Sequence, residues 1–274
     1  MTRMGSLEEF RARDARPDVV EGKEEEEGGW SAVALTRVRA GGHDVDLVEI
    51  GQRGAQSYVL VHGIGASTRS LGPLASRLAG SGHVLAPDLP GFGRSPRPAE
   101  PLSVADLARV VAGVIDSSGL TLPVVVGHSM GAQVVTELAA THPGMVRKAV
   151  LLGPVANVRE RSLSWHAVRL LQNCAYEPAR VNALLAADYV RCGPRWYGAT
   201  LPHMLGYRIE DRLTAVTDPV VVVRGGKDPI VPLSWLRVLT SAAPDARLVE
   251  ITGAAHAVMY TRPAQVATLC QGDR

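Results

Sequence analysis

The pentapeptide Gly127-His128-Ser129-Met130-Gly131 directly follows an apolar run at residues 122–126. A short β-branched run of this kind is typical of a buried parallel strand, and residues 132–141 have the periodicity of a helix. The glycines at both ends of the pentapeptide allow the backbone to turn sharply between the two segments. The pattern therefore predicts a strand, a tight turn and a helix, with the Ser129 hydroxyl held above the end of a sheet.

A serine hydroxyl is a weak nucleophile at neutral pH and needs a base that a third group holds in place. Two later strand-like runs lead into loops that carry such residues. Residues 219–223 precede the loop with Asp228, and residues 246–251 precede the loop with His256. The order Ser129, Asp228, His256 predicts a nucleophile, an orienting acid and a general base.

Other acidic and histidine residues have less suitable positions. Asp218 comes before its strand, at the opposite edge of the sheet, where a turn or capping role is expected. Asp88 precedes the pentapeptide, and we interpret it as structuring a loop near the site. The histidines without a matching context are His43, His83, His142, His166 and His203.

A further strand-like run at residues 57–61 ends at His62-Gly63-Ile64-Gly65. A loop of small residues lets backbone N–H groups point at an oxyanion, and one such donor lowers a barrier by about 3 kcal/mol. We predict that the two donors are the N–H groups of Ile64 and Met130.

These motifs together resemble the α/β-hydrolase superfamily over about residues 31–270. The resemblance rests on residues 62–65, residues 88–95 (Asp-Leu-Pro-Gly-Phe-Gly-Arg-Ser), the pentapeptide, residues 226–228 and His256, all in family order. It is strongest to single-domain bacterial members, which include carboxylesterases, lactonases, carbon–carbon bond hydrolases and cofactor-free perhydrolases. Because position 129 is Ser, the resemblance argues against the dehalogenase and epoxide hydrolase branches, which use a carboxylate nucleophile.

Strand-like and helical stretches alternate along most of the chain, which predicts an α/β fold. We expect a mostly parallel eight-stranded sheet with helices on both faces, built from residues 30–154 and 214–274. Residues 31–39 and 44–50 predict an opening hairpin, and a last helix is expected near residues 263–270.

Strand-like segments stop recurring between residues 155 and 213, after the sixth predicted strand at 148–152. Helical patterns there, at 165–174 and 179–189, predict a small helical cap over the site. The candidate substrate contacts are Trp165, Trp196 and Met204 in the cap and Ile230 in the loop after Asp228. Aromatic residues at helical spacing are also typical of core packing, which is the alternative for the cap residues.

Residues 1–29 differ from the rest of the chain because they are acidic and carry few apolar side chains, with four consecutive glutamates at 24–27. Such a segment cannot offset its ordering entropy by burial, so a mobile extension is expected.

Composition limits the other classes of partner. The net charge of +2 gives no electrostatic reason to expect nucleic acid, and no run approaches the roughly 20 apolar residues of a membrane span. Three cysteines match no metal-ligand spacing and are expected to be thiols in a reducing compartment. Since no signal peptide is evident, a cytoplasmic location is predicted. The oligomeric state has no signal in the sequence.

The predicted reaction is hydrolysis of an ester or lactone of a small, largely apolar substrate through an acyl-enzyme, without metal or cofactor. Three alternatives stay open on the same residues: an acyltransferase, a carbon–carbon bond hydrolase, and a small-molecule receptor with slow turnover.

Overall fold

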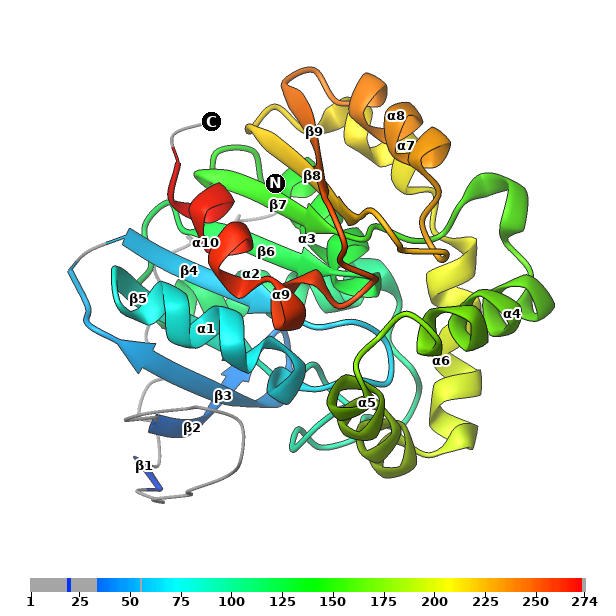
Figure 1. Ribbon diagram of the computed structural model, residues 1–274. Helices are drawn as coiled ribbons and strands as arrows, with labels where there is room; N and C mark the ends of the chain where they lie inside the picture. The colour runs from blue at the N-terminus through cyan, green and yellow to red at the C-terminus, as the bar shows by residue number, and fades with distance from the viewer. Residues whose placement is uncertain (1–18, 21–33, 55, 273–274) are drawn as a thin grey trace, which may run out of the picture.

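The computed structural model describes residues 19–20, 34–54 and 56–272. The strands in these ranges form one sheet in the order β1-β2-β3-β5-β4-β6-β7-β8-β9 (Figure 1). Their bounds are β1 Val19–Val20, β2 Ala34–Ala40, β3 His43–Gly51, β4 Gln56–Val61, β5 Gly82–Pro87, β6 Val124–His128, β7 Lys148–Leu152, β8 Val220–Gly225 and β9 Ala246–Ile251. The pairs β1–β2, β2–β3 and β3–β5 are antiparallel, and all other neighbours are parallel.

The eight expected strands are confirmed as β2 to β9. The two-residue β1 is added at the free edge of β2, which offers unpaired backbone groups. Apart from these two residues, the predicted extension 1–29 lies outside the described residues.

The opening hairpin has a tighter connection than the sequence suggested. The pairing of β2 with β3 runs up to Ala40 opposite His43, so the loop is only Gly41–Gly42. Both glycines have positive φ, +55° and +83°, which suits a two-residue hairpin turn and lets the strands extend further than predicted.

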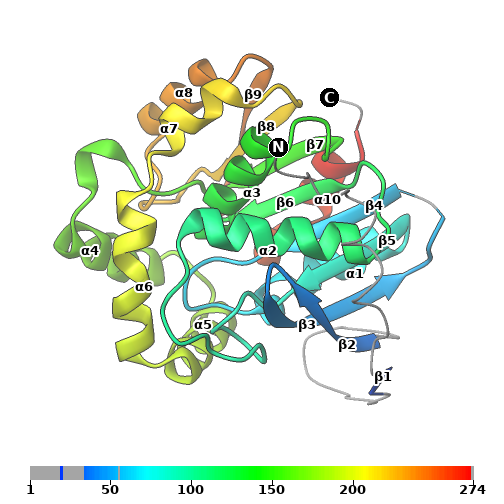
Figure 2. The same cartoon turned by 180° about the vertical axis from the view of Figure 1, so that it is seen from behind.

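Helices cover both faces of the sheet (Figures 1 and 2). On one face lie α1 (Gly72–Ala79), α9 (Val258–Thr261) and α10 (Pro263–Gln271). On the other face lie α2 (Val104–Ser117), α3 (Met130–Thr141) and α8 (Leu233–Ala242). The central strands are therefore buried on both sides: Val125 of β6 points into one core, and Val124 and Val126 point into the other. This two-sided burial explains their continuous apolar runs.

The segment 155–213 contains α4 (Leu163–Cys174), α5 (Ala179–Cys192), α6 (Pro194–Gly206) and α7 (Ile209–Arg212). Figure 1 shows α4, α5 and α6 beyond the carboxyl ends of the strands, as a cap beside the sheet. The short α7 instead contacts α3 and α8 of the core.

The described residues also form three 3₁₀ turns: η1 (Thr68–Leu71), η2 (Val158–Glu160) and η3 (Leu213–Ala215). None of the helices within the described ranges has the length and apolar character needed to cross a membrane.

The strand order places a topological switch point between β4 and β6. The chain leaves β4 toward α1 on one face of the sheet and leaves β6 toward α3 on the other. Loops that diverge in this way open a gap at the carboxyl edge, which is where open α/β sheets bind ligands.

The first turn of α3 packs directly on the end of β4. A β-carbon at Gly131 would collide with the carbonyl oxygen of Val61, and one at Gly127 would collide with the carbonyl of Gly131. Since the colliding atoms are backbone, they cannot move aside as a flexible side chain could.

We predict that Gly131→Ala lowers the free energy of unfolding by about 1–3 kcal/mol or more, because the methyl group overpacks this junction. The matched control is Gly198→Ala inside α6. Apart from the neighbouring residues and backbone of its own helix, no described atom lies within 4 Å of an added β-carbon there. This control should gain about 0.5–1 kcal/mol from helix propensity. Urea denaturation measures both, and equal effects at the two positions would contradict the packing argument.

Candidate active site

Ser129 occupies the sharp turn between β6 and α3 in a strained backbone conformation. Its φ of +57° and ψ of −117° lie outside the regions that non-glycine residues favour. Its N–H donates a hydrogen bond to the carbonyl of Leu152 at the end of β7, at 2.9 Å. Strain of this kind persists only where the surroundings enforce it, and it occurs mostly at functional sites.

The loop after β4 lies against this turn. A β-carbon at Gly63 would stand 3.0 Å from Cβ of Ser129, so the backbone of the loop borders the serine side chain. Ile64 follows and is buried. Met130 is the first residue of α3, where backbone N–H groups have no helical carbonyl partner. Gly63, the residue before Ile64, therefore lies against Ser129, and Met130 follows Ser129 directly in the chain.

The buried imidazole of His62 connects this loop to the one after β5. Its Nδ1 donates to the carbonyl of Gly63 at 2.8 Å, and its Nε2 accepts from the N–H of Leu89 at 2.9 Å. Burial lowers the pKa of His62 despite the nearby charge of Asp88, which keeps the ring neutral and suits this donor and acceptor pair.

Asp88 organises the loop that follows β5, as its position in the sequence indicated. One carboxylate oxygen accepts from the N–H of Thr68 at 2.8 Å, and the other accepts from the N–H of Arg94 at 2.9 Å. These bonds go to backbone groups of two loops, so Asp88 has a structural role beside the site.

Asp228 and His256 come together at the ends of β8 and β9. His256 Nδ1 and Asp228 Oδ2 are 2.7 Å apart, and both side chains are buried. Asp228 Oδ1 accepts from the N–H groups of Ile230 at 2.8 Å and Val231 at 3.3 Å, which fixes the carboxylate. With Nδ1 donating to Asp228, Nε2 of His256 is the nitrogen that can accept a proton.

The charges around His256 favour its protonated form. Burial lowers its pKa, but the charge and hydrogen bond of Asp228, together with the charge of Glu177, outweigh burial and raise the pKa above its ordinary value. His128 lies beside it, with ring centroids 4.6 Å apart, and donates from Nε2 to the His256 carbonyl at 3.2 Å. Burial and the neighbouring His256 hold the pKa of His128 well below its usual range, so it adds no competing positive charge.

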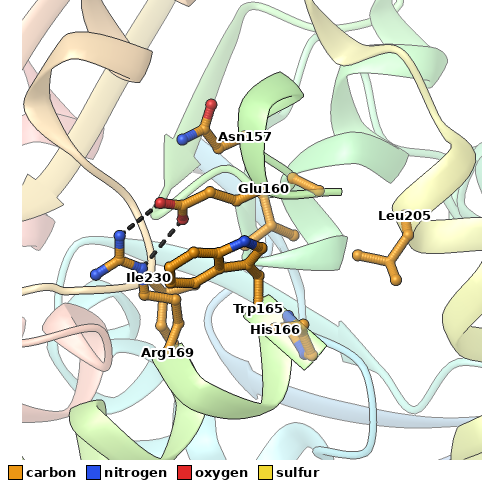
Figure 3. Close-up of a pocket in the computed structure, with 9 residues that line it drawn as sticks. Asn157, Glu160, Trp165, His166, Arg169, Leu205 and Ile230 are labelled. Carbon is orange, nitrogen blue, oxygen red and sulfur yellow. Dashed lines mark hydrogen bonds and ion pairs between the residues drawn. The ribbon is translucent and has the colours of Figure 1, made fainter. Parts of the chain in front are cut away.

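A pocket opens beside this pair, between the cap and the core (Figure 3). It is lined by Val155, Ala156, Asn157, Glu160, Trp165, His166, Arg169, Leu205 and Ile230. Ile230 also donates its N–H to Asp228, which links the pocket wall to this carboxylate.

The predicted substrate contacts separate into two groups. Trp165 and Ile230 line this pocket, and Trp165 is 48% exposed beside the ion pair of Glu160 and Arg169 (Figure 3). Trp196 instead packs on the backbone of Gly91 under the guanidinium of Arg97. Met204 is fully buried, and its carbonyl accepts a hydrogen bond from Gln133.

His166 is a pocket residue that no motif or spacing in the sequence singles out. It lines the pocket, and its Nε2 is 3.1 Å from the hydroxyl of Tyr197. Burial, with a smaller contribution from His256, lowers the pKa of His166 to about 4, so the ring is neutral at physiological pH. It lies on α4, in the cap, and only the folding of the cap onto the core brings it here.

Comparison with known proteins agrees with this fold. Residues 58–269 match the α/β-hydrolase family, and the chain belongs to that family. A RutD protein of Azorhizobium caulinodans, provisionally named a carbamate hydrolase, is 27% identical over 248 residues, which cover 82% of this chain and 93% of that protein. The pimeloyl-[acyl-carrier protein] methyl ester esterase of Neisseria meningitidis is 28% identical and covers 77% of this chain and 90% of its own length. The crystal structure of an enol-lactonase from Burkholderia xenovorans LB400 shares the fold, with a TM-score of 0.74, 22% identity and coverage of 85% and 97%.

The pH dependence of turnover should report His256. A base must be neutral to accept a proton, and the folded protein favours the charged imidazole, so kcat/KM should rise with pH through a midpoint above 6.5, the ordinary value for histidine. Asp228→Asn removes a negative charge that raises the pKa of His256, so the midpoint should move to lower pH. The plateau value of kcat/KM should also fall. The measurement is kcat/KM for an activated ester across the neutral range. A wild-type midpoint below the ordinary histidine value would contradict the electrostatic argument.

Proposed function

We propose that this protein is a serine hydrolase that cleaves an ester or lactone of a small, largely apolar substrate through an acyl-enzyme. The observation that carries the proposal is the buried Asp228–His256 hydrogen bond of 2.7 Å at the carboxyl edge that also holds the strained Ser129. A strained serine and an oriented imidazole on one sheet edge are the parts that nucleophilic acyl transfer requires.

In the proposed mechanism, His256 Nε2 takes the proton of the Ser129 hydroxyl as the oxygen attacks the substrate carbonyl. Asp228 holds the imidazole in the required tautomer and stabilises the imidazolium that forms. The proton then passes to the leaving alcohol. Water, activated in turn by His256, adds to the acyl-enzyme and releases the acid.

Charge on the tetrahedral intermediate would be met by the N–H groups of Ile64 and Met130. The loop with Ile64 is braced by His62, and the first turn of α3 is fixed by its packing on β4. Donors held this way need no reorganisation as charge develops, which is the source of their effect on the barrier.

An ester or lactone is proposed because its leaving group needs little assistance beyond these parts. Two observations support the choice: a relative named as a methyl ester esterase at 28% identity, and a pocket wall with apolar side chains such as Leu205 and Ile230.

Ser129→Ala should lower kcat by roughly 10⁴-fold or more with the fold intact, because triad members act as one unit. Asp228→Asn should lose less. A phosphonate ester should label wild-type protein at Ser129, as read by mass spectrometry of the peptide, and should not label Ser129→Ala. Turnover by purified Ser129→Ala close to that of wild type would end the serine-nucleophile proposal.

Turnover of an activated ester separates the hydrolase from two of the alternatives that the sequence left open, the acyltransferase and the receptor. Repeated turnover with release of acid supports a hydrolase. Preferential transfer of the acyl group to an added alcohol would instead indicate an acyltransferase, and a single stoichiometric acylation would indicate a receptor.

Trp165 should affect which acyl group is accepted, since it forms part of the pocket wall. Trp165→Ala should change the relative kcat/KM of short and long acyl chains by about 1 kcal/mol, because one large apolar contact is lost. Val190→Ala, an exposed position on α5, is the control and should leave the profile unchanged. If Trp196→Ala shifts selectivity and Trp165→Ala does not, the substrate lies under α6 rather than in this pocket.

A further inference from the structure

Two buried side chains of the cap hold the loop that carries His256. Asn173, near the end of α4, accepts a hydrogen bond at Oδ1 from the N–H of His256 at 3.3 Å. Glu177, in the turn before α5, accepts at Oε1 from the N–H of Ala257 at 2.6 Å. Asn173 is 4% exposed and Glu177 is 6% exposed. Both contacts cross from the cap to the core, between segments about 80 residues apart in sequence.

The α4–α5 turn fixes the position of these two groups. The N–H of Glu177 donates to the Asn173 carbonyl at 3.1 Å, and Nδ2 of Asn173 donates to Oε1 of Glu177 at 3.4 Å. Nδ2 of Asn182 donates to the carbonyls of Cys174 at 2.8 Å and Glu177 at 3.4 Å. The turn is therefore a braced unit that presents a carboxylate to the His256 loop.

The second carboxylate oxygen of Glu177 has a different environment. Oε2 is buried and has no hydrogen-bond partner among the described residues. A buried carboxylate oxygen without a hydrogen bond is costly unless a positive charge compensates it. The groups whose charges raise the pKa of the His256 imidazole are Asp228 and Glu177, whereas the rings of His128 and His166 have lowered pKa values. Glu177 is thus the second carboxylate whose charge acts on an imidazole that becomes positive during acyl transfer.

We propose that Glu177 is a positioning residue for the catalytic base: it fixes the His256 loop through the Ala257 N–H and favours the imidazolium through its charge. This inference rests on the proposed role of His256 as general base. It places one turn of the cap in the machinery of the reaction, whereas the pocket residues of the cap serve substrate selection.

Two substitutions separate the two roles of Glu177. Glu177→Gln keeps an oxygen that accepts from Ala257 and removes the charge, so the rising limb of kcat/KM should move to lower pH with little loss at its plateau. Glu177→Ala removes both, and kcat should fall by about tenfold to a hundredfold, because a misplaced base is costly in rate. Glu210→Gln is the matched control: Glu210, on α7, is a carboxylate paired with Arg161, and its substitution should change neither property.

A binding role or a purely structural role gives different results. If Glu177→Gln keeps the wild-type midpoint, the charge has no effect on His256 and the proposal is overturned. It is also overturned if Glu177→Ala raises KM without lowering kcat. Should Glu177→Ala fail to fold, the Gln variant and the titration below still decide.

An NMR titration tests the inference without any turnover. In Ser129→Ala protein, the imidazole pKa of His256 should be higher than in Ser129→Ala/Glu177→Gln, since the second protein lacks one negative charge. Equal values would overturn the role of Glu177. If Ser129→Ala instead retains turnover, the proposed function fails, while this titration still measures the charge interaction on its own.

Discussion

The strained turn at Ser129 is the constraint on which the site depends. A non-glycine residue at φ +57° costs about 1–3 kcal/mol and is retained only where packing enforces it. Here the enforcement is the contact of Gly131 with the end of β4 and of Gly127 with Gly131. The same contact brings the loop of Gly63 and Ile64 beside the serine. One packing junction therefore positions both the proposed nucleophile and the proposed oxyanion donors.

The cap is connected to more than one of the loops around the site. Asp188 of α5 accepts a hydrogen bond from the Ser67 hydroxyl at 2.7 Å, and a β-carbon at Gly65 would meet the rings of Tyr189 and Tyr197. These contacts hold the loop after β4, while the α4–α5 turn holds the loop of His256. The segment that the sequence predicts to be a cap thus also stabilises the loops of the core, because its buried polar groups pair with backbone N–H groups and a hydroxyl of the core.

Electrostatics at the site follow from which buried groups carry charge. The rings of His62, His128 and His166 all have lowered pKa values, for which burial is the main cause. His256 is the exception, since the charge of Asp228 and a smaller effect of Glu177 more than offset its burial. The site therefore contains one imidazole suited to gain a proton near neutral pH, surrounded by neutral ones.

The sequence alone determined the α/β fold and the strands β2 to β9. Strands buried on both faces leave continuous apolar runs, and the succession of strands and helices along the chain can be read directly from these runs. The sequence also placed Ser129, Asp228 and His256 at strand ends, where the structure shows Asp228 and His256 in contact. Only the tertiary structure separated Trp165, on the pocket wall, from Met204, in the core, since both lie in helical segments with similar patterns. Only the tertiary structure brought His166, Asn173 and Glu177 to the site, because their contacts join residues far apart in sequence and depend on how the cap packs. Such contacts leave no periodicity or motif, so no local pattern could have predicted them.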